Sequence, residues 1–244
     1  FLYGIELMGD GLKNSSGAAL KRVLEKVTGN VVMGVLTGAL VTAVIQSSTA
    51  TIVLTVALIG AGVLNLKQAV SIVMGANIGT TITGILVSLD VGELAPLFAF
   101  IGVVVLVFIK NPKLQHIGQI LAGLGVLFIG MDMMSGAMSP LRESELFIRL
   151  MSNFSNPLLG ILFGTVFTAI IQSSSAAVGI VQTLSEAGIL PFGSAVFVLF
   201  GTNIGTCVTA VLSSMGANRN AKRATLIHLM FNMIGTVIFT AAVL

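Results

Sequence analysis

Long apolar stretches, interrupted at regular places by short polar motifs, make up most of this chain. Nearly unbroken apolar runs occupy residues 94–109, 117–131 and 224–244, and runs that approach twenty residues are typical of helices that cross a membrane. The short alternation of apolar and polar residues that marks the strands of a membrane β-barrel is not visible in the sequence. The pattern therefore predicts an all-α polytopic membrane protein.

The polar motifs occur twice, and the second copy follows the first by 126 residues. Gln-Ser-Ser-Thr-Ala at 46–50 returns as Gln-Ser-Ser-Ser-Ala at 172–176, and Gly-Ala-Asn-Ile-Gly-Thr at 75–80 returns as Gly-Thr-Asn-Ile-Gly-Thr at 201–206. The spacing between the two motifs is the same in both copies, which chance does not preserve over so many positions. The sequence is therefore that of a duplicated unit.

The duplication divides the chain into a first transmembrane repeat, 1–116, and a second transmembrane repeat, 117–244, which together form one core. Each repeat is expected to contain a helix, a charged amphipathic stretch, an apolar segment around the Gln-Ser-Ser motif, a helix broken at the Asn-Ile-Gly motif, and a plain spanning helix. In the first repeat these parts are 1–12, 15–28, 31–60, 69–89 and 94–109, and in the second they are 117–134, 141–151, 157–185, 192–214 and 224–244. The first helix looks cut at its start, so we interpret the chain as the ordered core of a longer protein.

The segment 31–60 contains no charged residue. It is long for one crossing and short for two, which need roughly forty residues. The polar motif at its middle favours a re-entrant helical hairpin, because irregular backbone at membrane depth is tolerated where protein or a cavity surrounds it. Each repeat then crosses three times, and an odd number of crossings predicts two inverted repeats around a site at the middle of the membrane.

Charged residues make up only 9% of the chain, against roughly a quarter of an average soluble domain. Under the three-crossing topology, ten Lys and Arg residues fall on one face and two on the other, so the positive-inside rule makes the first face cytoplasmic. We therefore expect a multi-pass protein of the cell inner (plasma) membrane, embedded in the lipid bilayer. If each hairpin crossed once, the division would still be nine against three, so the charges do not decide how the hairpins run.

The repeated motifs carry the groups needed to bind an anion together with Na⁺. Hydroxyl residues at the start of a half-helix cap its free N–H groups, and these groups with the helix dipole attract anions. The predicted anion ligands are Ser47, Ser48, Thr49, Asn77, Gly79, Thr80, Ser173, Ser174, Ser175, Asn203, Gly205 and Thr206. Side-chain oxygens and unwound carbonyl groups suit Na⁺. The predicted Na⁺ ligands are Gln46, Ser48, Asn77, Thr80, Thr81, Gln172, Ser174, Asn203 and Thr206.

Small polar residues also let membrane helices pack closely, so a single Gln-Ser-Ser motif favours packing, whereas the duplicated pairs favour a binding site. Glu6 and Asp132 occupy equivalent positions near helix ends, where an interfacial, solvated role is expected. His228 has no repeat partner and is expected to be structural, with a proton relay as the alternative, and Cys207 is expected to fill space.

No nucleotide-binding loop, transition-metal cluster or pair of nucleophile and base is present in the sequence. We therefore predict that the protein is not an enzyme, uses no organic cofactor and binds no nucleic acid, with Na⁺ as its one metal ion.

The paired motifs resemble those of the type II sodium-dependent phosphate cotransporter family, and the resemblance covers nearly the whole chain. The string from Arg223 through His228 to Asn232 is also similar to the helix that follows the second Asn-Ile-Gly motif in that family. The resemblance implies a secondary active transporter that couples Na⁺ to the movement of inorganic phosphate, with elevator-like alternating access and both ligands on the residues given above. Electrogenic animal members carry an acidic residue shortly after the first hairpin motif, whereas this chain has Gly-Ala-Gly at 60–62.

Two alternatives stay open at this point. One is a transporter of another oxyanion such as sulfate, because hydroxyl groups and helix ends recognise charge and size. The other is a membrane sensor that binds phosphate without moving it. The sequence also leaves open a homodimer, the stoichiometry of Na⁺, and import against export.

Overall fold

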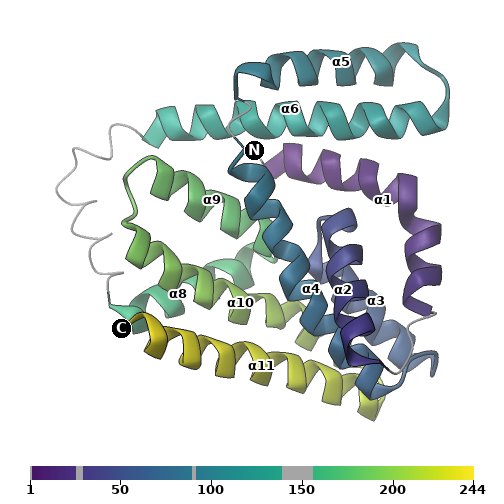
Figure 1. Ribbon diagram of the computed structural model, residues 1–244, viewed down its shortest axis with the longest axis vertical. Coiled ribbons are helices and arrows are strands. Elements are labelled where there is room, and N and C mark those ends of the chain that lie inside the picture. The colour runs from purple at the N-terminus through teal and green to yellow at the C-terminus, as the bar shows by residue number, and fades with distance from the viewer. Residues whose placement is uncertain (1, 26–29, 90–91, 139–155) are drawn as a thin grey trace.

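The computed structural model describes residues 2–25, 30–89, 92–138 and 156–244, and these residues are almost entirely helical (Figure 1). The elements of the first half are α1 (Leu2–Glu25), α2 (Val31–Ile45), α3 (Ser48–Gly60), α4 (Leu66–Val87), the short 3-10 helix η1 (Gly92–Leu94) and α5 (Ala95–Phe108). Those of the second half are α6 (Pro112–Met138), α8 (Pro157–Ile171), α9 (Ser174–Glu186), α10 (Phe192–Ser214) and α11 (Arg219–Val243).

The duplication in the sequence is also a duplication of elements. Helices α2 and α3 recur as α8 and α9 with the same lengths, 126 residues later, and α4 recurs as α10. Even the caps repeat, since the side chain of Asn30 accepts a hydrogen bond from the amide of Val32 and Asn156 accepts one from Leu158. The same local sequence therefore builds the same helical hairpin twice.

The predicted breaks at the two Asn-Ile-Gly motifs are wrong, because α4 and α10 run through them as continuous α-helices. The glycines of these motifs serve contact between helices instead. A Cβ atom on Gly75 would overlap the carbonyl oxygen of Val35 in α2, and one on Gly201 would overlap that of Ile161 in α8. The glycines therefore allow two backbones to touch without interrupting either helix.

The predicted division between a helix at 1–12 and an amphipathic stretch at 15–28 is also wrong, because α1 continues to Glu25. The hydroxyl group of Ser15 donates to the carbonyl oxygen of Leu12 within the helix, so this polar residue is accommodated without a turn. The stretch predicted at 141–151 and residues 26–28 lie outside the described residues.

The helices form two bodies. In the first, which we call the frame layer, α6 packs between α1 and α5. Glycines again set these contacts, since Gly123 faces Met8 of α1, and Gly102 of α5 faces Ala122. In the second body, the hairpin core, α2 packs on α4, α8 packs on α10, and α11 covers the far side (Figure 1).

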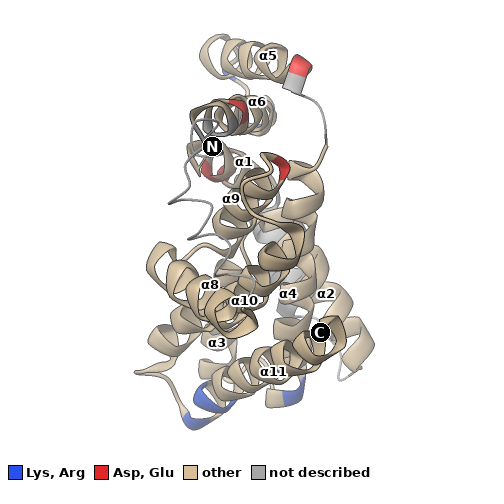
Figure 2. Ribbon diagram, turned by 90° about the vertical axis from the view of Figure 1, so that its left-hand side faces the viewer, with Lys and Arg blue, Asp and Glu red and all other residues tan. Residues whose placement is uncertain are grey.

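Four described helices are long and apolar enough to cross a membrane, namely α4, α6 over Pro112–Met133, α10 and α11. Large apolar side chains cover the outer surface, and Figure 2 shows few charged stretches on it. The protein is therefore a polytopic membrane protein.

The hairpin helices of 15 and 13 residues reach only about 20 Å each, less than the ~30 Å hydrocarbon core. In Figure 1 the α2–α3 hairpin opens toward the lower right and the α8–α9 hairpin toward the left, with both turns between them. The inverted topology itself stays a prediction.

Candidate functional site

Each hairpin turns at its Gln-Ser motif. Gln46 ends α2 in the left-handed conformation with φ 56°, and Gln172 ends α8 with φ 55°. Their backbone amides still donate to the carbonyl oxygens of Thr42 and Thr168 at 2.7 Å. A left-handed non-glycine residue costs roughly 1–2 kcal/mol, and such conformations gather at functional sites. The same uncommon turn therefore appears twice at the predicted ligands.

The residue after each glutamine caps the next helix. The hydroxyl oxygen of Ser47 accepts a hydrogen bond from the amide of Ala50 at 3.1 Å, and that of Ser173 accepts one from Ala176 at 3.2 Å. The amides just before Ala50 and Ala176 have no partner inside a helix, because the first N–H groups of any helix lack one. Together with the helix dipole, they give each turn a positive electrostatic end.

The two turns meet. The hydroxyl groups of Ser48 and Ser174, equivalent residues of the two repeats, lie 3.0 Å apart and are both buried. Ser175 donates from its hydroxyl to the backbone carbonyl oxygen of Gln46 at 3.3 Å. Contact between equivalent residues is what a two-fold relation between the repeats predicts, as in a symmetric dimer. The hairpin helices also contact the long helix of the opposite repeat, because α3 packs on α10 and α9 packs on α4.

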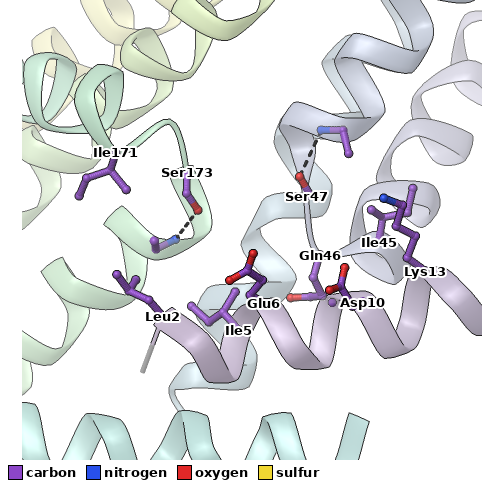
Figure 3. A pocket seen from close by; sticks show the side chains of 13 residues that line it. Leu2, Ile5, Glu6, Asp10, Lys13, Ile45, Gln46, Ser47, Ile171 and Ser173 are labelled. Carbon is purple, nitrogen blue, oxygen red and sulfur yellow. Dashed lines mark hydrogen bonds between the residues drawn. The ribbon is translucent and has the colours of Figure 1, made fainter. Parts of the chain in front are cut away.

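A cavity of about 430 Å³ lies in front of the paired turns. One wall is formed by Gln46 and Ser47 of the first hairpin and Ser173 of the second, and the opposite wall is α1 (Figure 3). The space exceeds the roughly 30 Å³ that one water occupies in the liquid by more than tenfold. It therefore has room for a small oxyanion together with water or a cation.

Helix α1 brings three charged side chains to this cavity, Glu6, Asp10 and Lys13. Their spacing of four and three residues places them on one face of the helix. Glu6 was expected only at the membrane interface, and Asp10 and Lys13 were not singled out as site residues. The helical spacing of these charges in an otherwise apolar segment is the signal that could have found them.

The cavity brings together only part of the predicted ligand set. Gln46, Ser47 and Ser173 line it, and Ser48, Ser174 and Ser175 are buried next to these turns. The other predicted ligands are not among its lining residues: Thr49, Gln172, Asn77, Gly79, Thr80, Thr81, Asn203, Gly205 and Thr206.

The residues of the Asn-Ile-Gly motifs take part in packing and in hydrogen bonds inside the hairpin core. Asn77 donates from its side-chain nitrogen to the side-chain oxygen of Asn232 in α11 at 2.6 Å, and the side-chain nitrogen of Asn232 donates to the sulfur of Cys207 at 3.1 Å. Asn203, the repeat equivalent of Asn77, is exposed. Buried His228 lies beside this group, with its Nε2 atom 3.8 Å from the Cys207 sulfur. A polar network therefore joins α4 of the first repeat to α10 and α11 of the second.

The threonines of these motifs bond within their own helices. Thr80 donates to the carbonyl oxygen of Ala76 at 3.1 Å and Thr206 to that of Thr202 at 2.9 Å, while exposed Thr81 donates to Ile78. Their roles as ligands stay predictions.

A family model described as "Na+/Pi-cotransporter" matches the chain twice, over residues 1–136 and 129–243. The chain belongs to the Na⁺/Pi-cotransporter family.

Several curated proteins are similar to this chain. Escherichia coli (strain K12) has a protein named "Putative inorganic phosphate export protein YjbB", 31% identical over 238 residues, or 97% of this chain and 44% of YjbB. "Uncharacterized protein YqeW" of Bacillus subtilis is 29% identical over 240 residues, 96% of this chain and 76% of YqeW. The human "Sodium-dependent phosphate transport protein 2B" is 30% identical over 135 residues, 51% of this chain and 20% of that protein. This chain thus spans less than half the length of YjbB. No solved structure matches it.

The two hairpins differ in one buried hydrogen bond. Thr42 donates to the hydroxyl oxygen of Thr51 at 2.9 Å, whereas Ala177 stands at the repeat position of Thr51. Among the described residues, the hydroxyl of fully buried Thr168 consequently has no partner. The second hairpin therefore lacks a bond that holds the first one closed.

We expect Ala177→Ser to stabilise the protein by up to about 1 kcal/mol, because it supplies a partner for Thr168. Thr51→Ala should destabilise it by about 1–3 kcal/mol, because it leaves the hydroxyl of Thr42 buried and unpaired. Thermal unfolding of the detergent-solubilised protein measures both effects. If both variants shifted the unfolding temperature by the same amount in the same direction, this hydrogen bond would not distinguish the two hairpins.

Proposed function

We propose that this protein is a secondary active transporter that couples Na⁺ to the movement of inorganic phosphate across the membrane, and that it binds phosphate in the cavity between Ser47 and Ser173. The observation that carries the proposal is the meeting of two capped helix N-termini at one cavity. The hydroxyl groups of Ser47 and Ser173, one from each repeat, line the same space, and the positive ends of α3 and α9 behind them suit a small tetrahedral anion. Family membership and the names of the relatives support phosphate as that anion.

Oxygen atoms at the turns supply a place for Na⁺. The carbonyl and side-chain oxygens of Gln46 lie at the C-terminal, negative end of α2, beside the phosphate donors of α3. Such ends of interrupted helices coordinate Na⁺ in secondary transporters. Na⁺ bound beside phosphate offsets its negative charge during the crossing, so each ligand favours binding of the other.

Alternating access follows from two inverted repeats, 1–116 and 117–244. The contact between Ser48 and Ser174 supports a two-fold relation with its axis at the turns. The cavity lies between α1 of the frame layer and the turns of the hairpin core, an arrangement that favours an elevator-like movement of the core along the frame. We place the protein in the inner (plasma) membrane, with its Lys- and Arg-rich face in the cytoplasm.

In proteoliposomes, an inward Na⁺ gradient should drive uptake of radiolabelled phosphate, and an equal K⁺ gradient should not. Ser47→Ala and Ser173→Ala should each raise the KM for phosphate about tenfold or more, because each removes a donor near a charged ligand. The same variants lose a helix cap worth about 1 kcal/mol, so their thermal unfolding is measured alongside.

Ser88→Ala, at an exposed helix end away from the cavity, is the control and should transport normally. Phosphate binding without flux would favour a sensor. If the protein unfolds normally but shows neither phosphate binding nor phosphate flux, phosphate is not the substrate.

A further inference from the structure

We propose that Glu6 and Asp10 make the cavity selective for an oxyanion that still carries a proton, and thereby for phosphate over sulfate. This inference rests on the proposed function, because it assigns selectivity to the same cavity. Neither residue belongs to the Gln-Ser-Ser or Asn-Ile-Gly motifs.

The cavity has two walls of opposite character. The turns contribute the hydroxyl groups of Ser47 and Ser173 and, behind them, the positive ends of α3 and α9 that these serines cap. Figure 3 shows the carboxylates of Glu6 and Asp10 directed from α1 toward these turns, with Lys13 one helical turn further on. An anion bound at the turns therefore presents its far side to two carboxylates.

A carboxylate only accepts hydrogen bonds. Phosphate keeps one or two protons near neutral pH, so a P–OH group that faces α1 donates to Glu6 or Asp10. Sulfate carries no proton under these conditions, and its oxygen atoms meet the carboxylates with like charge. The same wall therefore holds one oxyanion and repels another of nearly equal size and shape.

The total charge of the cavity strengthens this discrimination. Two carboxylates and one ammonium group leave the side chains of α1 with a formal charge of −1 at this wall, while each helix N-terminus contributes roughly half a positive charge. The cavity is therefore not a strongly cationic site that would take any anion. Sites built to bond a substrate hydroxyl reject analogues without it by factors of about 10⁴–10⁵, and the solvent-exposed position of Glu6 and Asp10 lowers the factor expected here.

The test compares sulfate with phosphate in proteoliposomes that contain the full chain. The measured quantity is the Ki of sulfate as an inhibitor of phosphate uptake, divided by the KM for phosphate, at saturating Na⁺. Glu6→Gln and Asp10→Asn should each lower this ratio at least tenfold. Both residues are exposed, so the amide variants should fold, and thermal unfolding checks this.

Two variants serve as matched controls. Lys13→Gln removes a charge that attracts both anions, so it should weaken phosphate and sulfate alike and leave the ratio unchanged. Glu186→Gln removes an acid outside the cavity, at the end of α9, and should change neither constant.

Three results would overturn the inference. The first is a ratio of sulfate Ki to phosphate KM that stays unchanged in both acid variants, and the second is a wild-type ratio near one. The third is an effect of these variants on the Na⁺ dependence alone, which would make the carboxylates cation ligands. If wild type moves no phosphate at all, the proposed function fails. The inference is then decided by thermal stabilisation with phosphate against sulfate in wild type and Glu6→Gln.

Discussion

Gly201→Ala is expected to prevent the second hairpin from packing and to destabilise the protein by about 3 kcal/mol or more, at the upper end of the range for overpacked contacts. The added Cβ would overlap the backbone carbonyl oxygen of Ile161 and crowd the amide of Thr165, both in α8. Backbone atoms cannot rotate away as a side chain does, so the two helices would have to separate. The effect is measured in detergent, where the variant should lose both the monodisperse peak and the unfolding transition.

Gly193→Ala in the same helix is the matched control. No atom lies within 4 Å of the position its Cβ would occupy, and alanine is the better helix former by about 1 kcal/mol. This variant should behave like wild type or slightly better. If Gly201→Ala were equally well tolerated, the close packing of α8 on α10 would be refuted. Gly75→Ala in α4 tests the equivalent contact of the first repeat with α2.

A disulfide between Ser48→Cys and Ser174→Cys is expected to abolish phosphate uptake reversibly. The two hydroxyl oxygens lie 3.0 Å apart, so a small shift brings two sulfurs to the bonding distance of about 2.05 Å. The turns hold the substrate, and its release to opposite sides of the membrane requires one turn to move away from the other. The experiment uses a Cys207→Ser background, in which the single native cysteine is absent.

Thiol labelling before and after oxidation measures the cross-link, and uptake is assayed before and after reduction. Each single cysteine variant should keep its free thiol, and oxidation should not change its uptake. Reactive thiols in the oxidised double variant would contradict the contact between the turns. Full uptake by the cross-linked protein would show that the turns stay together throughout transport.

The turns are the part of this molecule that the sequence predicts best. A glutamine followed by serine in a long uncharged segment specifies a helix end and a new helix start, because both depend on neighbouring residues only. The repeat strengthens that prediction, since Gln46 and Gln172 adopt the same left-handed conformation. The sequence predicts capping hydroxyl groups at 47–49 and 173–175, and in the structure Ser47 and Ser173 are the caps.

The Asn-Ile-Gly motifs show the limit of such reasoning. A glycine such as Gly79 serves a helix break or a close contact equally well, and only the neighbouring helix decides between them. Here that neighbour is α2, whose Thr42 and Ala39 lie against Gly79. Asp10 and Lys13 were missed for a related reason, because the position of α1 in front of the turns depends on packing against α6 and α2.

The serine that meets its own equivalent has an evolutionary consequence. Under the predicted inverted topology, a half-length ancestor would have assembled this site from two oppositely inserted copies, and any mutation would have altered both turns at once. A single polypeptide with two repeats is free of that constraint, and the two equivalent glutamines have different surroundings. Gln46 is buried and accepts a hydrogen bond from Thr83 at 2.9 Å, whereas Gln172 is exposed. Duplication in tandem thus allows the two turns to differ, the first held by a buried hydrogen bond and the second ending in an exposed side chain.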